Sequence, residues 1–393
     1  MIKSNYLTII FYLFIPFCFI DVINGYFAFH GINIPLSQIY KLIIIISLIP
    51  LVINNVLFLF ISSALLLSII YQVVNYTVSF SEDIAVLIRI FIFILAILAF
   101  YNARNLLRSN HLELINKIYI VNFIFIFLSV LSGLLGFGLT TYGNHLASEI
   151  KYLGFKGFFY AGNELGALLI CLLPVVVFSL TKNRYKILTI ISFIFISFLI
   201  GTKTAILAIL ILSVVMIVSY VKTKLIFKVV LLITVMILFF CIGYYFSDTL
   251  ESKFELLSYY YNSRGLSYLI LSGRDVMFLD AVNFVNDKFT LFDYFFGVGS
   301  SYAASQVKSV EIDFADIMIW NGIFWMFLIY SIFILFSIYV SRLMPKDERL
   351  VIKTMFVLIL LASMIAGHVL TSAMLLPIIS LMLPYGYLKK QFT

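Results

Sequence analysis

Long runs of apolar residues constrain this chain more than any other feature of its sequence. A helix that spans a bilayer needs about 20 mostly apolar residues. Apolar residues make up 63% of the 393 residues and charged residues only 11%, whereas about a quarter of the residues in a soluble domain are charged. We therefore predict an all-α polytopic membrane protein with about twelve spans, at about 6–23, 38–53, 56–74, 84–101, 118–138, 163–181, 185–201, 204–221, 225–246, 315–340, 351–368 and 371–388.

Two apolar stretches are too long for one span each. The stretch 185–221 contains Gly201-Thr202-Lys203-Thr204 at its middle, so we expect a helical hairpin there. The stretch 351–388 divides in the same way at Gly367 and His368. The second of the twelve runs is the shortest, and a re-entrant segment is the alternative there.

The first apolar run is a retained span rather than a signal peptide. It lacks a small-residue cleavage site and is followed by Asp21. The three cysteines all lie inside apolar runs, which is typical of core residues and indicates neither a disulfide framework nor a zinc site. They are Cys18, Cys171 and Cys241.

The distribution of basic residues predicts the orientation of the chain. Lys and Arg concentrate in cytoplasmic loops of membrane proteins. With both termini in the cytoplasm, the inner segments carry sixteen basic residues against three acidic ones. The outer segments then carry nine basic and fifteen acidic residues, and Arg89 lies inside a span. The net charge of +8 therefore reflects membrane topology, and we expect no nucleic-acid partner.

This orientation divides the chain into three parts: residues 1–246 with spans 1–9, a large periplasmic loop at 247–313, and residues 314–393 with spans 10–12.

Ser272 and Asp275 resemble the start of a capped helix in the loop. Such a helix is either a lid over an outward-facing cavity or an interfacial helix lying on the bilayer. Its apolar residues recur at helical spacing: Phe278, Ala281, Val282, Val285 and Phe289.

Polar residues gather in a few stretches at the predicted outer face, and this set suits an anionic, lipid-linked substrate. A diphosphate needs two or more cationic donors, and Arg binds it with two parallel hydrogen bonds. A sugar acceptor needs a carboxylate or a histidine to take the proton of its hydroxyl group. The stretches are 156–164, 201–204, 272–275, 296–299 and 311–316.

Each of these residues also has a purely structural interpretation. Lys203 can be an interfacial residue that extends its amine towards water. Arg264 follows three tyrosines and can form a surface cation–π pair. Glu311, Asp313 and Asp316 can simply solvate the start of a helix, where negative charge is favourable.

Four of the polar stretches resemble the O-antigen polymerase and O-antigen ligase superfamily of bacterial envelope glycosyltransferases. Gly157, Phe159 and Asn163 match the family's Gly-x-Phe-x-Asn-Pro-Asn segment, and residues 201–205 resemble its Ser-Arg-x-Ala segment with Lys203 in the Arg position. Gly273-Arg274 opens the large loop, and Gly297-Val298-Gly299 follows as a Gly-x-Gly turn. Ligases carry a His eleven residues before a Gly at the tenth span; here that offset from Gly322 falls on Glu311.

The resemblance implies a GT-C-like fold and an inverting, metal-independent transfer between undecaprenyl-diphosphate-linked oligosaccharides, without a cofactor. The absence of a His at the ligase position favours a repeat-unit polymerase that makes O-antigen or capsular polysaccharide. Its expected partners are the lipid-linked oligosaccharide, the lipid bilayer and a chain-length regulator protein. Glu311 is the expected general base, and Arg274 is the expected catalytic diphosphate clamp. Lys203, Lys156 and Arg264 would assist in binding the diphosphate, and Asp313, Asp316 and Asn163 would hold the acceptor sugar.

Two alternatives stay open. A ligase would transfer the glycan to lipid A core, and a transporter or flippase would move the same lipid-linked unit. A transporter places charge at the bilayer midplane, and Arg89 is the strongest candidate for that depth. The sequence contains no phosphate-binding or dinucleotide-binding motif. No His has a second ligand at metal spacing, and the carboxylate pairs Glu82-Asp83 and Glu311-x-Asp313 could bind a divalent ion but show no third ligand.

Overall fold

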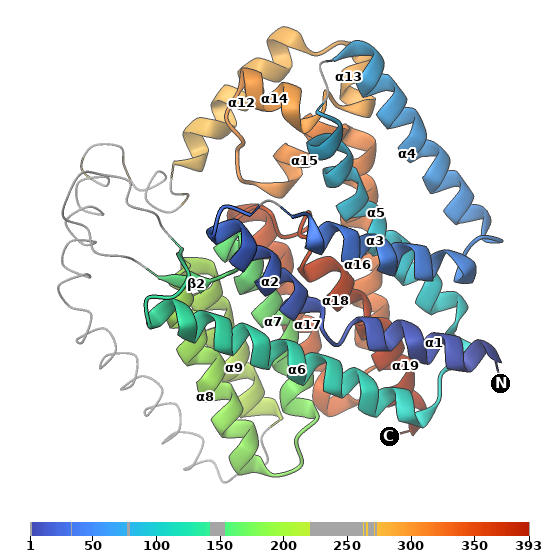
Figure 1. Cartoon of the computed structure of the whole chain (residues 1–393), viewed down its shortest axis with the longest axis vertical. Coiled ribbons are helices and arrows are strands. Elements are labelled where there is room, and N and C mark those ends of the chain that lie inside the picture. The colour runs from blue at the N-terminus through green and yellow to red at the C-terminus, as the bar shows by residue number, and fades with distance from the viewer. Residues whose placement is uncertain are drawn as a thin grey trace.

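The computed structural model describes residues 2–32, 34–76, 79–141, 154–220, 262, 265, 271 and 273–392. The chain forms a bundle of helices, with one short antiparallel pair of strands at one end (Figure 1). The first half comprises α1 Ile2–Leu13, α2 Phe17–Phe29, α3 Leu36–Leu48, α4 Val56–Asn75, α5 Phe80–Asn102, α6 Ser109–Leu134, β1 Leu139–Thr140, β2 Phe155–Gly157, α7 Gly162–Phe178, α8 Asn183–Ile200 and α9 Lys203–Ser219. The second half comprises α12 Arg274–Lys288, α13 Leu291–Phe296, α14 Ser300–Gln306, α15 Asp313–Asn321, α16 Ile323–Leu343, α17 Lys346–Ile365, α18 Leu375–Ser380 and α19 Met382–Phe392.

Several helices are long and apolar enough to cross a membrane, so the protein is a mainly helical, multi-pass membrane protein. In the described part of the chain there are six of them, and three further apolar helices are shorter. The structure does not establish the expected number of twelve, and the ninth expected run, 225–246, lies outside the described residues. The six are Asn5–Phe29, Val56–Asn75, Ala85–Asn102, Ser109–Leu134, Asn183–Ile200 and Ile323–Leu343.

The expected tenth span, 315–340, begins later than its hydropathy suggests. Gly322 has φ +87° and separates α15 from α16, so the membrane-length helix starts at Ile323. A Cβ atom on Gly322 would lie 2.1 Å from the carbonyl oxygen of Phe295. The close packing of α13 against this bend therefore requires glycine, and apolar composition alone could not reveal the bend.

Helix α7 forms the centre of the bundle. Every residue from Leu165 to Phe178 is buried, and the helix packs against α6, α8, α9, α17 and α18 (Figure 1). A helix that is apolar on all sides belongs in the interior of such a bundle. The predicted hairpin after α8 is observed, because Gly201 adopts a left-handed conformation at the end of α8 and α9 begins at Lys203.

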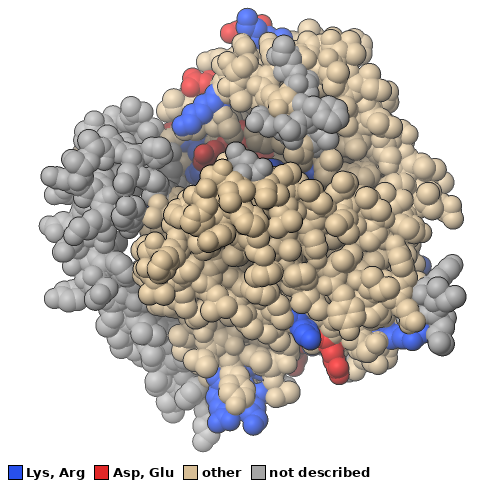
Figure 2. Space-filling view, viewed as in Figure 1, with Lys and Arg blue, Asp and Glu red and all other residues tan. Residues whose placement is uncertain are grey.

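Helix α4 lies at the periphery and exposes apolar side chains along most of its length. Val56 and Val74, at its two ends, are 79% and 75% exposed. Such a surface suits contact with lipid tails rather than water. Figure 2 shows the corresponding pattern on one face of the molecule, a broad uncharged band with charged side chains towards both ends.

The helices α12–α15 pack on one end of the bundle and are joined to it by polar contacts. Tyr71 and Tyr76, at the end of α4, both donate hydrogen bonds to Oδ1 of the buried Asp293 in α13. Asp83 in α5 accepts hydrogen bonds of 2.8 Å from the Ser300 hydroxyl and the Ser301 amide at the start of α14. The large loop therefore contains ordered helices in its second half, as expected.

The loop helix predicted from Ser272 onwards is observed as α12. Gly273, with φ +84°, precedes its first residue, Arg274, and Ser272 itself lies outside the described residues. Phe278 meets Phe314 of α15 at a ring-centroid distance of 5.9 Å, and Ala281 is buried. The predicted apolar face thus packs at least in part on α15.

Candidate active site

An ion pair joins α12 to the segment that precedes α15. Nη2 of Arg274 lies 2.7 Å from Oε2 of Glu311, and the two side chains are 14% and 43% exposed. The same nitrogen is 3.5 Å from the carbonyl oxygen of Ala366. Nε of Arg274 is buried and has no hydrogen-bond partner among the described residues. The guanidinium therefore has donor capacity that its protein contacts do not use.

The segment between α17 and α18, residues 366–374, holds this pair in place. The carbonyl oxygen of Ala366 accepts a 2.7 Å hydrogen bond from Nδ2 of Asn163, at the start of α7, as well as the contact from Arg274. Gly367 has φ +63°, and a Cβ atom there would lie 2.2 Å from the carbonyl oxygen of Glu311. Only glycine combines this conformation with this approach. The structure thus brings Arg274, Glu311 and Asn163 together around one turn.

Backbone strain concentrates at the same turn. Among the described residues other than glycine, only Glu311 and His368 have positive φ, and both have φ +57°. Such conformations cost about 1–3 kcal/mol each and cluster at functional sites. The backbone of Glu311 packs against Gly367, and His368 is the residue after Gly367. This local strain indicates a functional site without reference to any relative.

Asp313 and Asp316 occupy the first turn of α15, as predicted, but both carboxylates face the protein interior. Each residue is 1% exposed. Oδ2 of Asp313 accepts hydrogen bonds of 2.9 and 2.7 Å from the amides of Val369 and Leu370. Asp316 accepts hydrogen bonds from the Val310 amide and from Ser309 in the same way. The carboxylate of Asp313 is thus occupied by backbone amides, whereas Asp316 also lines a small cavity beside Trp320. Their expected role in holding the acceptor sugar stays a prediction.

Burial also changes the ionisation of these two carboxyl groups, which lie outside the membrane-length helix α16. Desolvation raises the pKa of Asp313 above its ordinary value, although the hydrogen bonds from Leu370 and Val369 act in the opposite direction. Desolvation raises the pKa of Asp316 as well. Their role in the described structure is to fix the segment 366–374 and the chain before α15.

The expected cationic residues are less closely grouped. Lys203, the first residue of α9, is close enough to Arg274 for their charges to repel. The amine of Lys156 donates a 2.7 Å hydrogen bond to the carbonyl oxygen of Tyr160, and burial lowers its pKa. Arg264 lies outside the described residues. Of the three assisting cations, Lys203 alone therefore has a described interaction with Arg274.

The comparison with known protein families decides the broader class. The family of O-antigen ligase-like membrane proteins matches residues 17–249, which is more than half of the chain. The chain belongs to this family. No curated protein matches the sequence.

The family match covers only part of the candidate site. It includes Asn163, Lys156 and Lys203, and it ends before Arg274 and Glu311. The family membership confirms the resemblance inferred from the short motifs. The family membership supports a broad functional class, a membrane protein that processes a glycan. The roles of Arg274 and Glu311 depend on the geometry instead.

The sequence did not predict two further contacts of this O-antigen ligase-like protein, one polar and one between backbones. Glu164, directly after Asn163, accepts a 2.6 Å hydrogen bond from the hydroxyl of Ser372. A second link thus ties the start of α7 to the segment 366–374. Gly367 and His368 were predicted only as a turn between two spans, and nothing in the local sequence indicates that this turn contacts Glu311.

Charged side chains of both signs are visible in a hollow between α12–α15 and the bundle (Figure 2). The Arg274–Glu311 pair links these same two parts of the molecule, since Arg274 also contacts Ala366 after α17. Within the described ranges no three His, Cys, Asp or Glu side chains converge as a metal site would require. The independence from metal ions that the resemblance implies stays a prediction.

Proposed function

We propose that this protein is a polysaccharide repeat-unit polymerase. It would transfer a growing glycan from undecaprenyl diphosphate to the non-reducing end of an incoming lipid-linked repeat unit, at the outer face of the bacterial inner membrane. The single observation that carries this proposal is the Arg274–Glu311 pair. In it, a guanidinium that could bind a diphosphate lies 2.7 Å from a carboxylate that could act as the base.

Arg274 would bind the diphosphate of the donor. Its Nη2 atom is now on Glu311, while its buried Nε atom has no partner in the described part of the chain. Diphosphate oxygens compete well for a guanidinium because they accept two parallel hydrogen bonds. The N-terminus of α12, where Arg274 lies, also favours an anion. Lys203 would add positive charge from the neighbouring α9 helix.

When the diphosphate binds Arg274, it would replace Glu311 as the hydrogen-bond acceptor and leave the carboxylate unpaired. The carboxylate then accepts the proton of the acceptor hydroxyl as that oxygen attacks the anomeric carbon of the donor. The bond from the anomeric carbon to the diphosphate oxygen breaks, and undecaprenyl diphosphate leaves with the electron pair. The attack occurs from the side opposite the diphosphate and therefore inverts the configuration. The cationic side chains stabilise the charge of the leaving group, so this proposal needs no metal ion.

Transfer of the glycan to lipid A core is the second candidate function, because the matching family is described as O-antigen ligase-like. Glu311 occupies the position at which ligases carry His. However, the turn that packs against Glu311 also contains His368, which could act on a different acceptor. The two functions share the donor and differ in the acceptor, so one assay with both acceptors separates them.

The test uses purified full-length protein in lipid nanodiscs, with a lipid-linked repeat unit alone or together with lipid A core. A polymerase converts the repeat unit into a ladder, whereas a ligase transfers the glycan to the core only. Arg274→Ala should abolish the ladder, and Glu311→Gln should slow single turnover by about 10²–10⁴-fold. Arg274→Lys retains the charge without the planar fork and should be intermediate or inactive.

Two control variants and one addition complete the assay. Arg184→Ala and Glu113→Gln remove the same groups from exposed positions on other helices and should leave the ladder intact. EDTA should not stop the reaction. Wild-type turnover in Glu311→Gln would end the general-base role, and full inhibition by EDTA would indicate a metal-dependent transferase.

A further inference from the structure

Trp320, in the last turn of α15, packs against the apolar cluster around Val298 and Ile319 but is only partly buried by it. Its backbone is firmly held, since its carbonyl oxygen accepts hydrogen bonds of 2.9 Å from Gln72 and 3.0 Å from the Gly299 amide. Its indole ring is only partly buried, and among the described residues its N–H donates no hydrogen bond. Trp325 differs in both respects, because it is fully buried and donates to Ser68.

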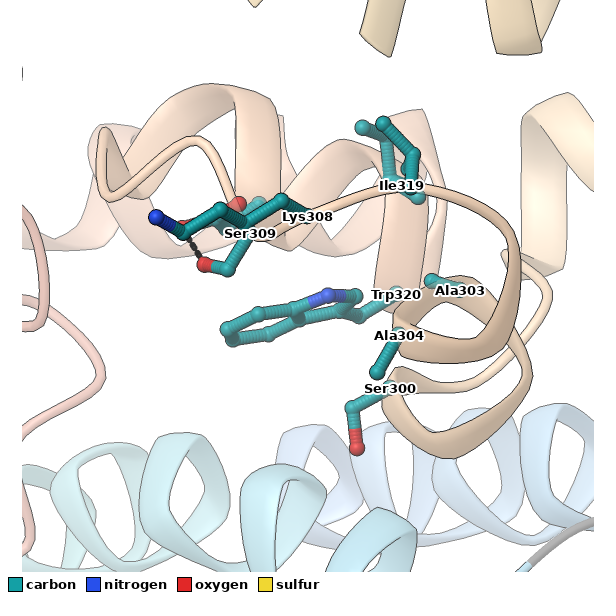
Figure 3. Close-up of a pocket in the computed structure, with 9 residues that line it drawn as sticks. Ser300, Ala303, Ala304, Lys308, Ser309, Ile319 and Trp320 are labelled. Carbon is teal, nitrogen blue, oxygen red and sulfur yellow. Dashed lines mark hydrogen bonds between the residues drawn. The ribbon is translucent and has the colours of Figure 1, made fainter. Parts of the chain in front are cut away.

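The indole ring lines a small cavity with a volume of about 40 Å³. Figure 3 shows the ring projecting from α15, with Ser309 and Lys308 on one side and Ala304 and Ser300 on the other. The walls therefore combine one large aromatic surface with two hydroxyl groups, one amine and the carboxylate of Asp316, which accepts a hydrogen bond from Ser309. Such a combination is suited to a ligand with an apolar face and a polar edge.

This cavity is directly connected to the Arg274–Glu311 pair. The ring of His368 lies nearly parallel to that of Trp320, with 6.3 Å between centroids and 15° between planes. His368 follows Gly367, which packs against the backbone of Glu311. His368 itself has φ +57°, so the backbone at this residue is strained.

We propose that Trp320 and His368 form a stacking platform for a sugar ring of the acceptor repeat unit. A pyranose has an apolar face of C–H groups that packs on an aromatic ring, and its hydroxyl groups lie around the edge. Ser300, Ser309 and Lys308 would bind those hydroxyl groups. The inference rests on the proposed polymerase function and gives that function an acceptor subsite beside Asp316.

The distribution of tryptophan allows a direct binding test. The chain has two tryptophans, and Trp325 is buried away from the cavity. A Trp325→Phe variant of the full chain therefore reports on Trp320 alone. The probe is the soluble oligosaccharide released from the lipid-linked repeat unit by mild acid. It should shift the emission of Trp320 saturably, whereas undecaprenyl diphosphate without sugar should not.

The kinetic test measures the acceptor and the donor separately in the nanodisc assay. Trp320→Ala should raise the KM for the acceptor about 10-fold, which corresponds to the loss of one stacking contact. Trp320→Tyr should retain most of the affinity because it keeps an aromatic face, and the donor KM should not change. Trp325→Phe is the matched control and should retain both KM values.

The outcomes separate this inference from the proposed function. A saturable emission shift without any ladder would support the sugar platform and reject the polymerase. A normal ladder with an unchanged acceptor KM in Trp320→Ala, and no emission shift in Trp325→Phe, would reject the platform and leave the polymerase intact. If Trp320→Ala does not accumulate, the emission of Trp320 in Trp325→Phe still decides the question.

Discussion

Asp313 provides the sharpest test of how the site is built, because two substitutions there should have opposite effects. Its Oδ2 atom accepts both backbone hydrogen bonds from Val369 and Leu370, and its Oδ1 atom lies 3.4 Å from the hydroxyl oxygen of Thr371. The amide of Asp313→Asn can present its oxygen to both N–H groups and its nitrogen to Thr371. Asp313→Ala leaves both N–H groups buried without an acceptor.

The magnitudes follow from these contacts. Each buried N–H group without an acceptor costs about 1–3 kcal/mol, so Asp313→Ala loses roughly 2–6 kcal/mol when the carboxyl group is protonated. Burial raises the pKa of Asp313 from 3.8 to about 6. Since one pKa unit corresponds to about 1.4 kcal/mol, the ionised form at neutral pH costs roughly 3 kcal/mol. Asp313→Asn removes this cost and should be neutral or stabilising at pH 7.

The sign of the pH dependence is equally specific. The folded protein holds this proton more tightly than the unfolded chain, so the stabilising contribution of protonated Asp313 is complete below pH 3.8. It is lost as the pH rises through about 6. The stability of the wild type relative to Asp313→Asn should therefore fall between pH 4 and pH 7. Asp316, whose pKa is also raised, contributes equally to the change of stability with pH in the wild type and in Asp313→Asn.

The assay is thermal unfolding in detergent micelles at a fixed heating rate, at pH 4.5 and pH 7. At pH 7 the Asn variant should melt at or above the wild-type temperature, and at pH 4.5 the Ala variant should melt below it. At pH 4.5 the wild type and the Asn variant should converge. An Asn variant that melts as low as the Ala variant at pH 7 would refute the hydrogen-bond assignment, because the ionised carboxylate itself would then be required.

Two further predictions concern the central turn and the topology. Gly367→Ala should abolish polymer formation, because the new methyl group would overlap the carbonyl oxygen of Glu311; a polymer of normal length on gels of the extracted glycan would contradict the packing. A reporter active only in the cytoplasm should function when fused at Asn183 or Lys346. One active only in the periplasm should function within 247–313, and the reverse result would invert the orientation.

The sequence predicts most of the helical architecture, because hydropathy and breaks such as Gly201 depend on local composition. The start of α12 at Arg274 was also predictable from the residues around it. The bend at Gly322 was not, because its cause is the approach of Phe295, which lies in a different helix. The same limit applies to α13, whose buried Asp293 is fixed by two tyrosines from the end of α4.

The candidate site was predicted in part. Arg274 and Glu311 were named separately from their motif positions, and the structure places them in one ion pair. Asp313 and Asp316 were expected to hold a sugar because they lie within five residues of the expected base, Glu311. Their partners are amides and a hydroxyl brought close by folding, and only some of these lie nearby in the sequence. A single sequence carries no signal for the contact between Gly367 and Glu311.

The pairing of Arg274 with Glu311 has a consequence for the order of events in the proposed polymerase. While the two side chains are paired, Oε2 of Glu311 is held by Arg274, and the positive charge beside it weakens the carboxylate as a base. Arrival of the donor diphosphate at Arg274 releases that base. Donor binding and base activation are then one step, and the acceptor hydroxyl on the Trp320–His368 platform is positioned to use it first. This coupling would limit hydrolysis of the donor, because a polymerase that activated water before its acceptor arrived would waste the growing glycan.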